Sequence, residues 1–71
     1  MGIRQVGTVN AFDVKKGEGV IIPAGGGKPL WFFSSDIDQD DRKSLPAGLT
    51  VSFETRLGPK GDMAYLVRAE G

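Results

Sequence analysis

Five short runs rich in β-branched and aromatic residues, separated by clusters of Gly, Pro and Asp, restrict the fold of this chain more than any other feature. The runs cover residues 3–12, 18–22, 30–34, 49–57 and 63–68, and the period of an amphipathic helix is missing from the sequence. Short strands at this spacing are typical of a small sandwich or barrel. Since 71 residues form one domain at most, residues 1–71 are predicted to fold as a single all-β domain.

Alternation within the fourth run predicts which side chains face the core. Val51 and Phe53 alternate with polar residues along residues 49–57, as on a strand with one buried face. With Ala64 and Val67 of the last run, they are the predicted core residues.

The third run is the most aromatic part of the chain. The two-residue period of a strand places Trp31 and Phe33 on one face and Leu30 and Phe32 on the other. At least one aromatic pair is therefore expected at the surface. The alternative is that Trp31 and Phe33 fill the barrel or cover its mouth, because aromatic side chains are usually partly buried.

Composition removes several classes of chemistry. The chain has no Cys and no His, which excludes disulfides, thiolate metal sites and a Cys nucleophile, and removes the commonest general base. A pair of acid and base carboxylates needs a cleft that separates their pKa values, and none is expected in so small a barrel. We expect no enzyme and no cofactor. Without a signal-like or membrane-spanning apolar segment, a soluble, cytoplasmic protein is expected.

Two short motifs resemble ligand-binding loops but lack required residues. Residues 36–41 begin like a calcium loop, yet Asp41 replaces the glycine at the sixth position and Ala47 replaces the glutamate at the twelfth. The three glycines before Lys28 suggest a phosphate loop, but Pro29 replaces the Ser or Thr. A solvated acidic loop after a short 3₁₀ turn near residues 35–37, and a flexible hairpin tip, are the simpler interpretations.

Three motifs occur in order along the chain: residues 7–13 (GTVNAFD), residues 16–21 (KGEGVI) and residues 29–37 (PLWFFSSDI). They correspond to G-x-V-K-W-F-N, K-G-F-G-F-I and D-V-F-V-H-F-S-x-I of the cold-shock domain family, which the chain resembles in order and spacing along nearly its whole length. The resemblance implies a five-stranded antiparallel OB-fold-like β-barrel. It also implies binding of single-stranded RNA or DNA, with bases stacked on aromatic side chains and phosphates held by Lys and Arg.

Several aromatic positions of the family are changed. Ala11 stands where the family has Trp, and Glu18 and Val20 stand where it has two Phe, so three stacking surfaces are absent. Each stacked base is worth about 1–3 kcal/mol, so the loss of two or three could weaken binding more than a hundredfold. Nine basic and nine acidic side chains also cancel, which counts mildly against nucleic acid. We therefore predict weak or altered binding.

The predicted nucleic-acid-binding residues combine the remaining aromatic positions with nearby polar and basic ones. Lys16 and Lys60 match basic positions of the family, although each could equally be an ordinary exposed lysine, and Arg42 could stack on a base through its guanidinium. The full set is Asn10, Phe12, Lys16, Trp31, Phe33, Arg42 and Lys60.

Two functions remain open. The first is a chaperone or regulator of single-stranded RNA or DNA. The alternative is a protein-interaction or self-association module on a cold-shock fold that has lost nucleic-acid binding, with a protein partner or a homodimer.

Overall fold

All five expected strands are present in the computed structural model, which describes residues 4–38, 45–59 and 61–70. In these residues the elements are β1 (Gln5–Asp13), β2 (Glu18–Pro23), β3 (Leu30–Phe33), the 3₁₀ turn η1 (Ser34–Asp36), β4 (Thr50–Gly58) and β5 (Gly61–Ala69). The strand boundaries agree with the sequence prediction to within two residues. The all-β class is therefore confirmed. In the same described ranges, no helix is long and apolar enough to span a membrane.

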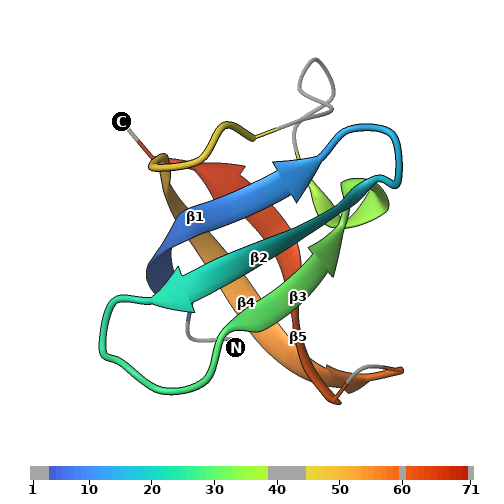
Figure 1. Ribbon diagram of the computed structural model, residues 1–71. Helices are drawn as coiled ribbons and strands as arrows, with labels where there is room; N and C mark the ends of the chain where they lie inside the picture. The colour runs from blue at the N-terminus through green and yellow to red at the C-terminus, as the bar shows by residue number, and fades with distance from the viewer. Residues whose placement is uncertain (1–3, 39–44, 60, 71) are drawn as a thin grey trace.

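The strands close into a barrel in the order β1-β2-β3-β5-β4. Neighbouring strands are antiparallel except β3 and β5, which run parallel and pair through Trp31 and Met63. A second parallel bridge joins Ile37 to Val67 and extends this seam beyond the end of β3. Figure 1 shows β1, β2 and β3 side by side as one wall, with β4 and β5 behind it. The structure therefore confirms the five-stranded barrel that the sequence predicts.

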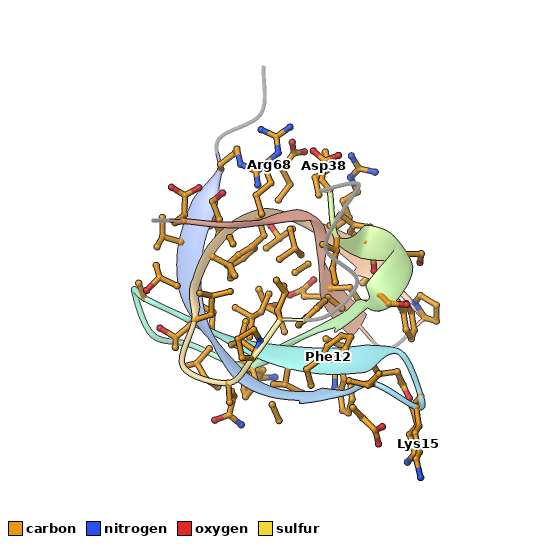
Figure 2. All side chains as sticks on the ribbon, turned by 90° about the horizontal axis from the view of Figure 1, so that it is seen from above. Phe12, Lys15, Asp38 and Arg68 are labelled. Carbon is orange, nitrogen blue, oxygen red and sulfur yellow. The ribbon has the colours of Figure 1, made fainter. Side chains whose placement is uncertain are left out.

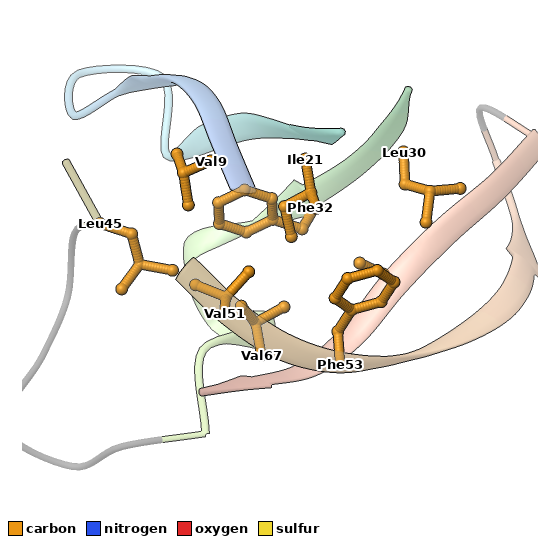
Figure 3. Packing of buried hydrophobic residues seen from close by; sticks show 9 residues of the cluster. Val9, Ile21, Leu30, Phe32, Leu45, Val51, Phe53 and Val67 are labelled. Atoms are coloured by element: carbon orange, nitrogen blue, oxygen red, sulfur yellow. The ribbon is translucent and has the colours of Figure 1, made fainter. Parts of the chain in front are cut away.

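The inward-facing side chains of all five strands form one core (Figure 3). All four predicted core residues, Val51, Phe53, Ala64 and Val67, are fully buried. On β3, Leu30 and Phe32 face inward, as the alternation predicts. Further buried side chains come from β1, β2, β5 and the segment before β4: Val9, Ile21, Met63 and Leu45. Burial of each large apolar side chain contributes roughly 1.5–3 kcal/mol, so this cluster is the main source of stability.

Two glycines let side chains and backbone approach closely in the wall formed by β1 and β2. A Cβ on Gly19 would lie 2.6 Å from the Phe32 ring, and one on Gly7 would lie 2.6 Å from the carbonyl oxygen of Ile22. A glycine within a strand often marks a bend or bulge, which predicts one at Gly7 from the sequence. The register shift instead falls between Val9 and Ala11, so Asn10 is the extra residue and the barrel bends there.

The segment after β3 is held by two aspartates of the acidic stretch. The Asp36 carboxylate accepts a hydrogen bond from the backbone N–H of Phe33 at 2.9 Å, which stabilises η1. Asp38 forms an ion pair with Arg68 at 2.6 Å, and the two side chains lie together in Figure 2. The remaining acidic residues of this stretch, Asp40 and Asp41, lie outside the described residues.

Arg4 ties the start of β1 to β4 and β5 at an irregular point of the sheet. Its guanidinium donates to the side chain and carbonyl of Ser52, at 3.0 and 2.9 Å, and to the carbonyl of Leu66 at 2.6 Å. Leu66 has a positive φ of 52°, which is uncommon for a residue with a side chain. It lies where the register of β4 and β5 shifts. Arg4 therefore holds a strained part of the backbone in place.

Candidate nucleic-acid interface

The outward face of β1, β2 and β3 is built from two cross-strand rows of side chains. Ala11 pairs with Val20, which pairs with Trp31. In the next row, Asp13 pairs with Glu18, which pairs with Phe33. Directly opposite side chains on neighbouring strands lie about 4.5–5.5 Å apart at Cβ, so each row forms a continuous surface.

Trp31 and Phe33 lie on the surface side of β3. Trp31 is 38% exposed and Phe33 is half-buried, whereas Leu30 and Phe32 between them are buried. The alternative that this pair fills the interior is therefore wrong, since Phe32 and Leu30 occupy that position. An exposed Trp beside a half-buried Phe offers flat rings on which a base can stack.

A hollow lies beside Trp31 on this face. Its volume is about 310 Å³, and its walls come from all three strands and from the turn between β1 and β2. It is lined by Ala11, Phe12, Lys16, Glu18, Val20 and Trp31 among others. The two residues opposite Trp31 in its row, Ala11 and Val20, are small, so they leave room where large aromatic rings would close the surface.

Trp31 separates this hollow from a second one. The second hollow, of about 370 Å³, is lined by Trp31, Pro29 and Leu57 among others, between the loop before β3 and the hairpin of β4 and β5. Trp31 is thus accessible from two sides. A third hollow of about 450 Å³, near Gln5 and Arg56, contains none of the residues predicted to bind nucleic acid.

Phe12 lines the hollow but is directed toward the interior. Its cross-strand partner is Gly19, and its ring stacks on that of Phe32, with centroids 5.6 Å apart and an angle of 24° between the planes. Because Gly19 has no side chain, the two rings can meet across β2. Phe12 is half-buried, so it forms part of the hollow's floor and supports the core at the same time.

Lys16 reaches the hollow from a turn that Asp13 organises. The carboxylate of Asp13 accepts hydrogen bonds from the backbone N–H groups of Lys15 and Lys16, at 3.0 and 3.2 Å. This arrangement is a turn in which an aspartate side chain replaces a backbone acceptor. Lys16 is exposed and lines the hollow, whereas Lys15 projects away from the barrel in Figure 2. The role of Asp13 was missed from the sequence, although an Asp just before a turn is the usual signal for it.

Of the remaining predicted residues, only Asn10 falls within the described part of the chain. Asn10 is exposed on the bulge of β1 and does not line the hollow. Arg42 and Lys60 lie outside the described residues. The structure therefore brings together Phe12, Lys16 and Trp31, with Phe33 in the neighbouring row. Among the described residues, no three acidic side chains lie close enough to hold a metal ion.

Comparisons with known proteins agree on one family. The model of the 'Cold-shock' DNA-binding domain matches residues 5–70. Cold shock protein CapA of Pseudomonas fragi is 47% identical over 64 residues, which cover 90% of this chain and 100% of that protein. Cold shock-like protein CspA of Bordetella pertussis is 43% identical over 64 residues, covering 90% of this chain and 96% of that protein. Cold shock-like protein CspD of Escherichia coli (strain K12) is 41% identical over 61 residues, covering 86% and 82%.

These matches extend across all five strands and include the three that carry the hollow and the exposed tryptophan. The identity is well above the level at which only a fold is shared, and it agrees with the barrel order and the resemblance expected from the sequence. The chain therefore belongs to the cold-shock domain family.

Proposed function

We propose that this protein binds single-stranded RNA or DNA on the outward face of β1, β2 and β3 and acts as a chaperone or regulator of nucleic-acid structure. Membership of the cold-shock family supports nucleic-acid binding in general. The observation that carries the finer proposal is the position of Trp31. It is exposed between two hollows, and Phe33 lies on the same side of β3.

Trp31 and Phe33 act as stacking surfaces for neighbouring bases. They are two residues apart on one strand, about 6.6 Å by the rise of a strand, so two unstacked bases can lie on them in sequence. Phe12 supports the floor of the hollow, and Lys16 faces the phosphate of the base that enters it. The predicted contributions of Asn10, Arg42 and Lys60 belong to the same proposal.

Affinity is lower than that of a full aromatic platform, or is directed to different sequences. Ala11 and Val20 present small side chains where the family motif has rings, and Glu18 adds a negative charge beside Phe33. With equal numbers of basic and acidic residues, long-range attraction to phosphate is weak. A cytoplasmic location, where single-stranded RNA is abundant, is part of this proposal.

Replacement of Trp31 tests the proposal. Trp31→Ala and Phe33→Ala should each weaken binding of a fluorescently labelled single strand roughly fivefold or more, measured by anisotropy at low salt. Tyr65→Ala, which removes an aromatic ring from β5 outside this face, is the matched control and should bind normally. Unchanged affinity of both β3 variants would disprove the proposed face.

The second candidate is a protein-interaction surface on the same wall. Val6 and Ile22 are exposed at 48% and 37% on β1 and β2, and together with Trp31 they give this face a substantial apolar content. Sedimentation equilibrium distinguishes the two functions. A monomer that binds oligonucleotides favours the first, whereas a stable dimer that is broken by Trp31→Ala and binds no oligonucleotide favours the second.

A further inference from the structure

The hollow beside Trp31 has the size of a site for one flat ligand. Its volume of about 310 Å³ is at the lower end of the range of about 300–1,000 Å³ that holds small molecules. Trp31 lines it together with Ala11 and Val20, the two apolar residues of the same cross-strand row. A single nucleobase can therefore lie against Trp31 with one edge directed along the hollow toward the next row.

Glu18 is the distinctive polar residue at that edge. It is half-buried, it lines the hollow, and its cross-strand partners are Asp13 and Phe33. The Asp13 carboxylate has a structural role, because its oxygen holds the backbone of the turn. An ionised carboxylate offers about four acceptor positions and no donor, so Glu18 can accept from a ligand in addition to its contacts within the chain.

A carboxylate in this position selects among the four bases by the pattern of donors on their edges. Guanine presents two adjacent donors, the ring N1–H and the 2-amino group, which match the two oxygens of one carboxylate. Adenine and cytosine present an amino group next to a ring nitrogen that accepts, and uracil and thymine present one N–H between two carbonyl oxygens. In these bases an acceptor faces the carboxylate, so only guanine forms two charge-assisted hydrogen bonds with it.

Charge favours a base edge over a phosphate beside Glu18. The carboxylate repels phosphate, whereas Lys16, in the turn that adjoins the row of Glu18, lines the same hollow and attracts it. A nucleotide therefore enters with its base edge, and not its phosphate, against Glu18. Because the base must use the edge that pairs in a duplex, only an unpaired base can bind in this way.

We propose that the hollow is a guanine-selective site and that Glu18 is its specificity-determining residue. The inference rests on the proposed function, and it names the base that the site prefers. The ligand is a guanine within a single strand of RNA or DNA. Its ring stacks on Trp31, and its N1–H and 2-amino groups donate to Glu18.

The test compares short oligothymidylates that carry one guanine, adenine, cytosine or hypoxanthine at the centre. Affinity is measured by anisotropy of a labelled strand and by quenching of Trp31, the only tryptophan of the chain. The guanine strand should bind about five- to tenfold more tightly than the adenine and cytosine strands, the lower part of the range for one well-formed bidentate contact. Hypoxanthine, which keeps N1–H but lacks the 2-amino group, should be intermediate.

Glu18→Gln provides the decisive variant, because it keeps the size of the side chain and loses one of the two acceptors. It should lose most of the preference for guanine. Glu54→Gln makes the same change of charge on β4, where Glu54 pairs with Arg4 and Arg56, and should keep the preference. Thermal melting of both variants confirms that they are folded.

The outcomes separate this inference from the proposed function. Guanine preference that disappears in Glu18→Gln and persists in Glu54→Gln supports the site. Tight binding of all strands with equal affinity, or a guanine preference that Glu18→Gln leaves unchanged, overturns the site and leaves the proposed function standing. Absence of binding to every strand overturns both.

Discussion

Glu18 stands where the family motif has Phe, and this difference most alters the outward face of β1, β2 and β3. Glu18→Phe reverses it. Position 18 is the cross-strand partner of Phe33 and borders the hollow beside Trp31. A Phe there adds a ring next to two existing aromatic side chains and removes a negative charge. We expect Glu18→Phe to bind single strands that lack guanine, such as oligothymidylate, more tightly than the unchanged protein.

The size of the gain follows from two contributions. One additional stacked base is worth about 1–3 kcal/mol, which corresponds to roughly 5- to 150-fold in affinity. Removal of the negative charge relieves repulsion of the strand's phosphates, by up to about 1 kcal/mol in water for a phosphate about 4 Å away. The second contribution is screened by salt and the first is not, so most of the gain should remain at high ionic strength.

Glu18→Ala separates the two contributions, because it removes the charge without adding a ring. Anisotropy titrations at low and high salt should show a gain of about fivefold for this variant that fades as salt is raised. Glu18→Phe should stay tighter than Glu18→Ala at every salt concentration, and both should lack a preference for guanine. If the Phe variant binds no more tightly than the Ala variant, side chain 18 does not face the bases and the proposed face is wrong.

Three further predictions concern the barrel and its charge. Gly19→Ala places a Cβ 2.6 Å from the Phe32 ring and should destabilise the fold by about 1–3 kcal/mol in urea unfolding, as overpacked cores do; an unchanged midpoint would contradict the close packing at Gly19. Arg4→Met removes the donors to the Ser52 and Leu66 carbonyls and should cost about 1–3 kcal/mol in the same assay, the range for hydrogen bonds from a charged group. A loss below about 0.5 kcal/mol, the usual effect of a surface substitution, would count against a structural role of Arg4. We expect at most three phosphate contacts, one of them from Lys16. They predict a slope of about −2 for the logarithm of the binding constant against the logarithm of the salt concentration. A slope twice as steep would show that further basic side chains of the protein bind the strand.

The strands and the core were predictable because both follow from local patterns. Alternation placed Val51 and Phe53 inside, and the same rule separated Trp31 from Phe32 on β3. The position of the bulge was not predictable in this way. Gly7 suggested it, but a glycine serves equally well where backbone and side chains approach closely, and the extra residue is Asn10.

The candidate site was only partly predictable, because it depends on which strands lie side by side. The aromatic residues of the candidate site were predicted from the resemblance to the family and from the alternation along residues 30–33, whereas the hollow arises from Ala11 and Val20 lying in one row with Trp31. That row joins three strands and is fixed by the register of the barrel. Phe12 illustrates the same limit, since its contact with Phe32 depends on Gly19 between them.

The departures from the family motif fall on the outward positions of the wall. Ala11, Glu18 and Val20 lie in the two rows that carry Trp31 and Phe33, whereas the inward positions keep an apolar core. Since neighbouring residues of a strand face opposite sides, the ligand face can change without disturbing the packing that holds the barrel together. Stability and binding are therefore separable in this protein.

The zero net charge of the chain affects how the binding energy is divided between phosphates and bases. Contacts with phosphate supply affinity that does not depend on sequence, and contacts with base edges supply discrimination. With nine basic residues balanced by nine acidic ones, the proposed mode of binding draws little energy from phosphate and a larger share from stacking on Trp31 and hydrogen bonds to Glu18. On that proposal, most single strands bind weakly and those that present guanine to the hollow are retained, so selectivity should increase as salt removes the remaining attraction to phosphate.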